Sequence, residues 1–328
     1  MLAHLLTTLL DRVFIMIRYI LKRLLWMIPI LLGVSIVVFW LTDLVPVDPA
    51  TSILGTAATK ESIEALNHQL GYDLPFGQRY LNYMIDVLFH FDFGTSYITK
   101  TPVLNELITR VPISAKVAFG AIVVAVFIGV PIGILSAVKQ YSILDAVSSA
   151  IAMVLAAAPA FVIGMLLLLE FSLKRGWLPA YFAAGADAYV LPILTLGLVY
   201  GATMMRFTRS SMLETIRQDY IRTARAKGIQ ERKVIMGHAL TNALLPVITA
   251  AGNTFAALLG GAVVTETLFS IPGLGTFVVN AVKQKDVPVV MGGTICIALL
   301  VSIVILTVDI IYAYVDPRIK AKYAKEAK

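Results

Sequence analysis

Six long apolar runs divide the chain. They lie at 24–41, 117–138, 146–169, 188–205, 243–265 and 287–308, and none contains a charged residue. Each is about 18–24 residues long, which is the length that an α-helix needs to cross the hydrocarbon core of a membrane. In lipid only helices and closed barrels satisfy their backbone hydrogen bonds, and these runs are too long for strands. The pattern therefore predicts an all-α polytopic membrane protein with six transmembrane helices.

The longest segment between the runs, 42–116, carries shorter amphipathic patterns. Thr101-Pro102 predicts the start of a helix, because proline is favoured in the first helical turn. An apolar and aromatic stripe precedes it, at Phe76, Tyr80, Tyr83, Met84, Val87, Leu88 and Phe91. We expect a small packed cap outside the membrane, which either shields the bundle or docks a partner.

A basic loop at 206–246 separates the fourth run from the fifth. Ile221, Ala224 and Gly228 follow helical spacing and predict one small apolar face on a short helix. Gly228 also supplies the position at which a helix can stop and the chain can turn. A second amphipathic segment follows, and Pro246 marks the beginning of the next apolar run. A loop this long and this regular is expected to dock onto a partner.

Charge is distributed unequally across the predicted membrane. Of the 27 Lys and Arg residues, 18 fall on one side, eight of them in the loop 206–246. Positive residues are retained in the cytoplasm, so we expect both termini and this loop to be cytoplasmic and 42–116 to lie outside. The net charge of +7 is thereby explained by topology, which makes a nucleic-acid partner a poor explanation.

Several chemistries lack their residues in this sequence. The four histidines lie outside the apolar runs without metal-ligand spacing, and no Gly-Lys dipeptide is present to build a phosphate-binding loop. Cys296 is the single cysteine, so no internal disulfide is possible. The runs also lack the charged residues that ion-driven carriers usually place in the membrane. Transport by this chain would need energy from elsewhere, and the basic loop is the candidate input.

A turn and a carboxylate follow the fifth run. Pro272, Gly273 and Gly275 are three helix-breaking residues in four positions, which predicts a turn on the external side. Glu266 stands at the end of the run. We expect Glu266 either at the membrane interface or, together with this turn, in an external gate, with the interface slightly favoured.

Glycine and proline are frequent within the runs, notably at 129–133 and at Pro159. Small residues allow helices to approach closely, and proline is tolerated inside a membrane bundle. Helix packing is the simpler interpretation, and hinges for a rocking motion are the alternative.

The chain resembles the membrane permease subunits of ABC importers for dipeptides, oligopeptides and nickel. The resemblance runs from about 16 to 318. Its segments are RYILKRLL at 18–25, LVPVDPA at 44–50, FDFGTS at 91–96, RSSMLE at 209–214, DYIRTARAKG at 219–228, HALTNALLP at 238–246 and PGLG at 272–275. The loop shared by such permeases usually reads Glu-Ala-Ala before its glycine. Here Arg222 and Thr223 replace the first two residues, as in the peptide branch of the family.

The resemblance implies a type I ABC importer permease fold and a five-part machine in the bacterial or archaeal inner membrane. This subunit would pair with a second homologous permease, two cytoplasmic ATPases and an extracytoplasmic solute-binding protein. It would hold no cofactor and catalyse nothing itself, because ATP and magnesium would bind the ATPases. The implied ATPase-coupling residues are Asp219, Tyr220, Arg222, Thr223, Ala224, Arg225, Lys227 and Gly228, and His238, Asn242 and Pro246 form the implied exit from the loop.

The expected organisation follows from the runs and the resemblance together. A cytoplasmic segment at 1–23 leads into the first helix at 24–41, an extracytoplasmic loop with short helices at 42–116, a five-helix domain at 117–315 that contains the loop 206–246, and a basic cytoplasmic tail at 316–328. Peptide import is the expected function. Import of nickel or another small solute by the same machine, an ion-coupled carrier, and a structural membrane anchor are the alternatives.

Overall fold

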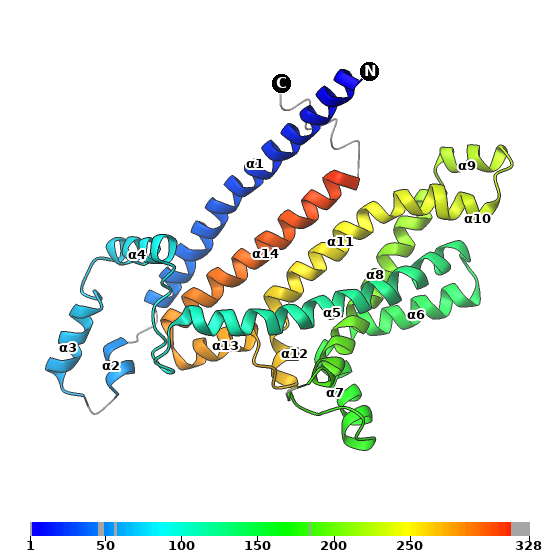
Figure 1. Ribbon diagram of the computed structural model, residues 1–328. Helices are drawn as coiled ribbons and strands as arrows, with labels where there is room; N and C mark the ends of the chain where they lie inside the picture. Colours follow the sequence, from blue (N-terminus) through cyan, green and yellow to red (C-terminus); the bar gives the residue numbers. More distant parts are fainter. Residues whose placement is uncertain (1, 45–48, 56–57, 184, 316–328) are drawn as a thin grey trace. The chain divides into compact units, whose positions relative to one another are not determined.

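The computed structural model describes residues 2–44, 49–55, 58–183 and 185–315, and these form helices joined by turns (Figure 1). The α-helices are α1 Leu2–Asp43, α2 Pro49–Leu54, α3 Lys60–Gln69, α4 Phe76–Ile85, α5 Val103–Val138, α6 Ile143–Ala157, α7 Ala160–Leu167, α8 Val190–Ile216, α9 Asp219–Ala226, α10 Glu231–Lys233, α11 Leu240–Gly261, α12 Val263–Leu268, α13 Leu274–Gln284 and α14 Val287–Val315. Shorter π- and 3-10 turns are η1 Asp86–His90, η2 Leu168–Lys174, η3 Asp187–Tyr189 and η4 Val234–Ala239. The predicted all-α class is confirmed. The tail at 316–328 lies outside the described residues.

The predicted spans coincide with long helices. Among the described residues, five segments are long and apolar enough to cross a membrane, namely Ile20–Asp43, Val103–Val138, Asp187–Ile216, Glu231–Gly260 and Val287–Ile311. A bent pair of helices, Ile143–Ala157 and Ala160–Lys174, makes a sixth span if it is counted as one. The six apolar runs of the sequence each fall on one of these segments.

The third run is not one straight helix, which corrects the expectation of a continuous span at 146–169. Helices α6 and α7 meet at a bend of 103°. The cause is Pro159, which lacks a backbone N–H and disfavours helical geometry at the residue before it. Ala158 accordingly adopts an extended conformation with ψ at 132°. The fifth run is also interrupted, at Ala262 between α11 and α12.

The helices divide into two compact units. The larger comprises Met1–Trp26, Lys116–Ser270 and Val301–Lys328, and within it α8 packs against α6, α7 and α11. Helix α5 also approaches α8 closely at two glycines. A Cβ atom on Gly129 would lie 2.8 Å from Met204 Cβ, and one on Gly133 would lie 2.8 Å from Thr208 Cβ. Close helix packing therefore accounts for these glycines.

The smaller unit comprises Met27–Ala115 and Ile271–Leu300. Its core joins the first turns of α5 to α13 and α14 through Val103, Leu107, Leu274, Ala281 and Val289. Helix α5 begins directly after Pro102, as predicted, so the second span starts earlier than the apolar run does.

The aromatic stripe of α4 also lies in the smaller unit, where it packs on the end of α1. The Phe39 ring lies 5.3 Å from Phe76 and 5.5 Å from Tyr80, measured between ring centroids. These contacts support the expected packed cap.

Candidate functional site

The segment after α8 forms a short helix, one face of which packs against neighbouring helices while the other face is exposed. Helix α8 ends at Ile216, and Gln218 adopts an extended conformation that turns the chain into α9. Figure 1 shows α9 and α10 together at one end of the larger unit, with α12 at the opposite end. The first of the two predicted short helices is therefore present as α9, whereas the second is the beginning of the long helical segment Glu231–Gly260.

Two residues fasten α9. Ile221 is fully buried and Ala224 is 8% exposed, and both join a cluster with the end of α5, α8 and η4. The other members of this cluster are Ala137, Met212, Val234, Ile235, Ala239 and Ala243. Burial of one isoleucine side chain contributes about 1.5–3 kcal/mol, so α9 is coupled to its neighbours by apolar contact along this edge. The predicted apolar face at Ile221 and Ala224 is confirmed.

The opposite face of α9 is polar and exposed. The side chains of Asp219 and Arg222 are 98% and 79% exposed, and their charged atoms are 3.9 Å apart. Tyr220 is also exposed. The hydroxyl of Thr223 donates a 3.0 Å hydrogen bond to the backbone carbonyl of Asp219. A weak surface pair of this kind costs little to break. Arg222 and Asp219 are therefore available to a partner.

Arg225 differs from Arg222, although the sequence placed both on the same helix. Its Nε and Nη2 atoms donate to the two oxygens of Glu231 at 3.1 and 2.8 Å. This hydrogen bonding raises the pKa of the Arg225 guanidinium above its usual value. The pair closes the turn between α9 and α10, so Arg225 is engaged within the chain.

The turn itself is made by Lys227, the C-cap of α9, and Gly228. Gly228 has a φ of +73°, in the left-handed region that glycine enters without steric cost. The predicted helix break is confirmed. Gly228 does not continue the buried face, however: it is exposed, and a Cβ atom there would meet nothing within 4 Å. Glycine is needed here for its backbone conformation and not for close packing, because the turn carries the residue away from the packed edge of α9.

The loop exit differs in detail from the expectation. His238 lies in η4, is exposed, and accepts a 2.9 Å hydrogen bond on its carbonyl from Asn242. Pro246 lies inside α11 and does not mark its beginning, since the helix starts at Leu240. The apolar run begins later than the helix because the polar residues Thr241 and Asn242 lie in the first turn of α11.

The candidate gate residues fall in different units. Glu266 is in α12 of the larger unit and is 2% exposed, which disfavours a place at the water–lipid interface. Pro272, Gly273 and Gly275 lie at the start of α13 in the smaller unit, where the two glycines are buried and the proline is exposed. Pro272 thus precedes a helix start, as the predicted turn requires.

A buried ion pair lies next to this loop and was not predicted. Arg209 of α8 contacts Asp145 at the start of α6 with Nε 2.6 Å from Oδ1 and Nη2 2.8 Å from Oδ2. Ser136 of α5 donates to the same carboxylate, as does the backbone N–H of Tyr141 at 3.0 Å. The side chain of Asp145 is only 6% exposed. The cluster therefore joins the ends of three helices shortly before α9 begins.

The sequence did contain a signal for this cluster. Ser142 caps α6 and accepts the N–H of Asp145 at 3.3 Å, a spacing typical of a helix start. Asp145 directly precedes the apolar run and is not among the predicted site residues, and the charge of Arg209 is counted only with the eight basic residues of the loop 206–246. Their pairing across 64 positions required the fold.

Comparisons with known proteins identify the family of this chain. A family model described as "Binding-protein-dependent transport system inner membrane component" matches residues 129–321, and the N-terminal model of such components matches residues 16–118. The glutathione transport system permease protein GsiC of Salmonella typhi is 40% identical over 307 residues, which are 94% of this chain and 100% of the relative. GsiC of Escherichia coli strain K12 is 39% identical over the same shares.

A solved structure shares the fold. The crystal structure of an amino acid ABC transporter with histidines has a TM-score of 0.51 and 16% sequence identity, and the match covers 66% of this chain and 94% of that chain. At this identity the likeness concerns the fold alone. The two family models and the curated relatives together show that the chain is a multi-pass inner-membrane protein that belongs to the family of permease components of binding-protein-dependent ABC importers.

Proposed function

We propose that this permease imports short peptides and that α9 is the helix through which a cytoplasmic ATPase drives it. The observation that carries the proposal is the two-sided construction of α9: Ile221 and Ala224 are buried on one side, and Asp219 and Arg222 are exposed on the other. A partner bound to the exposed face of such a helix can displace it, and the packed face transmits the displacement to the neighbouring helices.

The transmission would run through the cluster around Met212 and Ala239. These residues connect α9 to α8 and to η4, which leads into α11. ATP-driven closure of two ATPases would draw this helix and that of a second, homologous permease together, and the spans would tilt between inward-open and outward-open states. Rigid helices joined by packed side chains are suited to such motion, because packed interfaces do not deform continuously.

Peptides are the favoured substrate because the curated relatives are named glutathione transport permeases, and glutathione is a small peptide. A solute-binding protein outside the membrane would deliver the substrate, in keeping with the description of the family. Nickel or another small solute remains the alternative cargo of the same machine.

One experiment tests both parts. The tagged chain is purified from its native host in mild detergent, its partners are identified by mass spectrometry, and the complex is reconstituted with its binding protein in liposomes. ATP-dependent uptake of a labelled peptide, with a second permease and ATPases in the complex, supports the proposal. A chain that purifies alone and takes up solute without ATP would contradict it.

A further inference from the structure

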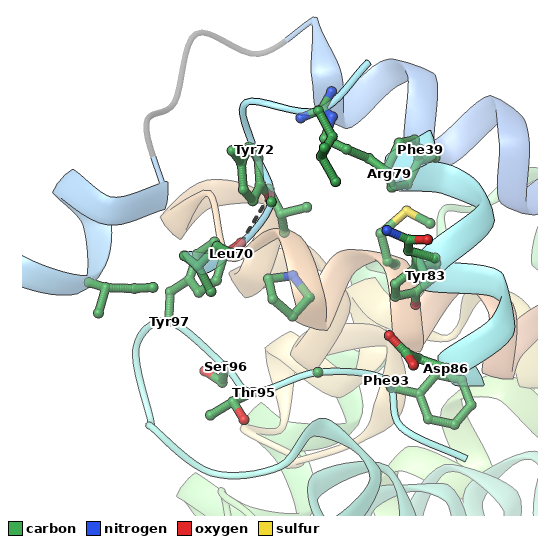
Figure 2. Close-up of a pocket in the computed structure, with 18 of the residues that line it drawn as sticks. Phe39, Leu70, Tyr72, Arg79, Tyr83, Asp86, Phe93, Thr95, Ser96 and Tyr97 are labelled. Atoms are coloured by element: carbon green, nitrogen blue, oxygen red, sulfur yellow. Dashed lines mark hydrogen bonds between the residues drawn. The ribbon is translucent and has the colours of Figure 1, made fainter. Parts of the chain in front are cut away.

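The smaller unit contains a cavity of about 450 Å³ that the coupling mechanism does not use. Figure 2 shows residues of α4 and of the irregular segment 93–97 around it, and Val287, Pro288 and Met291 of α14 also line it. A volume of this size accommodates a small organic molecule. Its apolar wall is formed by Phe39, Ile53, Leu70, Leu74, Phe93, Val287, Pro288 and Met291.

Two buried hydrogen-bond donors in this wall have no partner among the residues that the structure describes. They are Nε of Arg79 and the hydroxyl of Tyr83. An unpaired buried donor is unfavourable because it has lost its hydrogen bonds to water, and native proteins rarely leave two of them in one place. Both residues lie on α4 at positions i and i+4, so they project from the same helical face. A ligand that brings a hydrogen-bond acceptor to this face would satisfy both donors.

The two donors are held in place by other contacts. Another nitrogen of Arg79 pairs with Asp43, and the guanidinium lies 5.1 Å from the centre of the Tyr72 ring. The hydroxyl of Tyr72 is itself bonded to that of Tyr97 at 3.0 Å (Figure 2). Burial raises the pKa of the Tyr83 phenol, so its hydroxyl keeps its proton and can donate. A ligand would therefore find these donors already ordered.

A carboxylate stands at the other end of the same face. Asp86 follows Tyr83 by three residues and Arg79 by seven, and Figure 2 shows Tyr83 between them. Asp86 is half exposed, with Oδ1 3.3 Å from the Nδ1 atom of His90. Seven helical residues cover about 10 Å at a rise of 1.5 Å each. The face therefore presents a cation, a neutral donor and an anion in order along about 10 Å.

We propose that this cavity binds a zwitterionic di- or tripeptide with an apolar side chain, its terminal carboxylate on Arg79 and Tyr83 and its ammonium group on Asp86. An extended chain spans about 3.5 Å per residue, so the ends of a di- or tripeptide are about 7–10 Å apart. This matches the spacing between Arg79 on α4 and Asp86 at the start of η1, and the wall around Phe39 and Met291 receives the side chain. The inference rests on the proposed peptide import and adds a substrate site outside the ATPase-coupled half of the chain.

Two tyrosines of α4 provide a matched test. Tyr83→Phe removes only a hydroxyl that has no partner within the described part of the chain. Tyr80→Phe removes a hydroxyl that lies 2.8 Å from Ser35 Oγ and does not line the cavity. The probes are the dipeptide Ala-Phe, its C-terminal amide and its N-acetyl form. Binding is measured by calorimetry on the complete transporter in nanodiscs without its binding protein, and thermal unfolding is followed on the same samples.

The two variants are expected to differ in opposite ways: Tyr83→Phe changes binding and Tyr80→Phe changes stability. Tyr83→Phe weakens binding of Ala-Phe about 10- to 100-fold, the effect of one hydrogen bond to a charged group, and leaves the unfolding temperature unchanged or higher. Tyr80→Phe lowers the unfolding temperature and leaves binding unchanged. The amide binds the unchanged transporter more weakly than Ala-Phe, and Asp86→Asn weakens Ala-Phe but not the N-acetyl form.

Equal affinity of Ala-Phe for the Tyr83→Phe and unchanged transporters would overturn the site. So would the absence of saturable binding, or a phospholipid or partner side chain found in the cavity by native mass spectrometry or cross-linking. If the unchanged complex still imports Ala-Phe with ATP in that case, only this site fails and the proposed function stands.

Discussion

Arg209 and Arg222 are both arginines of the basic loop, yet the structure gives them opposite environments. Arg209 makes a two-pronged contact with a buried carboxylate, and its side chain is 28% exposed. Arg222 is 79% exposed and its nearest acid is 3.9 Å away. The Arg209 guanidinium is hydrogen-bonded to protein groups, whereas the Arg222 guanidinium remains hydrated. The comparison teaches that charge in this loop has two separate uses, fastening helices and presenting a surface.

Removing one member of the buried pair is expected to have the largest effect. Asp145→Ala leaves the Arg209 guanidinium without its partner, and a broken buried pair costs about 3–5 kcal/mol. Thermal unfolding of the detergent-solubilised complex should show a clear drop. The control is Glu170→Ala, which breaks the exposed pair with Arg175 and should leave the unfolding temperature almost unchanged, because solvent screens such pairs. Similar losses in the two variants would show that the Asp145 cluster does not fasten the helices.

The next largest effect is expected at the turn between α9 and α10. Gly228→Val forces a β-branched residue to a φ of +73°, at a cost of about 1–2 kcal/mol. We predict loss of peptide uptake with normal abundance in the membrane, because the strain changes how α9 is presented. Gly228→Asn is the matched control, since asparagine tolerates this conformation. Normal uptake by the valine variant would contradict a coupling role for the turn.

Reversal of the exposed charge should leave stability untouched. Arg222→Glu breaks only the exposed pair with Asp219, which contributes little to stability, so the unfolding temperature should hardly change, as for most surface substitutions. Recovery of the ATPase with the tagged permease should fall, by about tenfold if one charged contact of about 1.4 kcal/mol is lost. Undiminished recovery and uptake would show that Arg222 does not face the ATPase.

The smallest effect is expected for Arg225, whose partner lies within the chain. Arg225→Ala breaks the surface pair with Glu231, which is worth about 0–1 kcal/mol. Unfolding of the complex should change slightly, and Glu231→Gln should give the same change because it breaks the same pair. ATPase recovery with Arg225→Ala should stay above that with Arg222→Glu. The reverse order would exchange the roles of the two residues.

The sequence predicted the features that depend on local pattern. The apolar runs located the spans, Thr101-Pro102 located the start of α5, and the spacing of Ile221 and Ala224 identified the packed edge of α9. The break at Gly228 followed from the freedom of glycine alone. Each of these rests on residues that are close together in the chain.

What the sequence could not predict depends on residues that are far apart. Asp145 and Arg209 meet only when α6 packs against α8, and the cavity gathers Phe39, Tyr83 and Pro288 from three separate elements. The bend at Pro159 was underestimated because proline can also sit inside a continuous membrane helix. The sequence also could not show that Arg225 and not Arg222 forms an ion pair within the chain, because this depends on the position of Glu231 after the turn.

The central claim is that the exposed face of α9 contacts an ATPase, and site-directed cross-linking tests it most directly. Cys296 is the single cysteine, so Cys296→Ser gives a background into which Tyr220→Cys is placed on the exposed face of α9. Ile98→Cys, exposed in the segment predicted to lie outside, is the control. In native membranes treated with a thiol-to-amine cross-linker, we predict an ATPase adduct for Tyr220→Cys alone, with a yield that changes on adding ATP. A transport-competent Tyr220→Cys permease that gives no ATPase adduct would contradict the account.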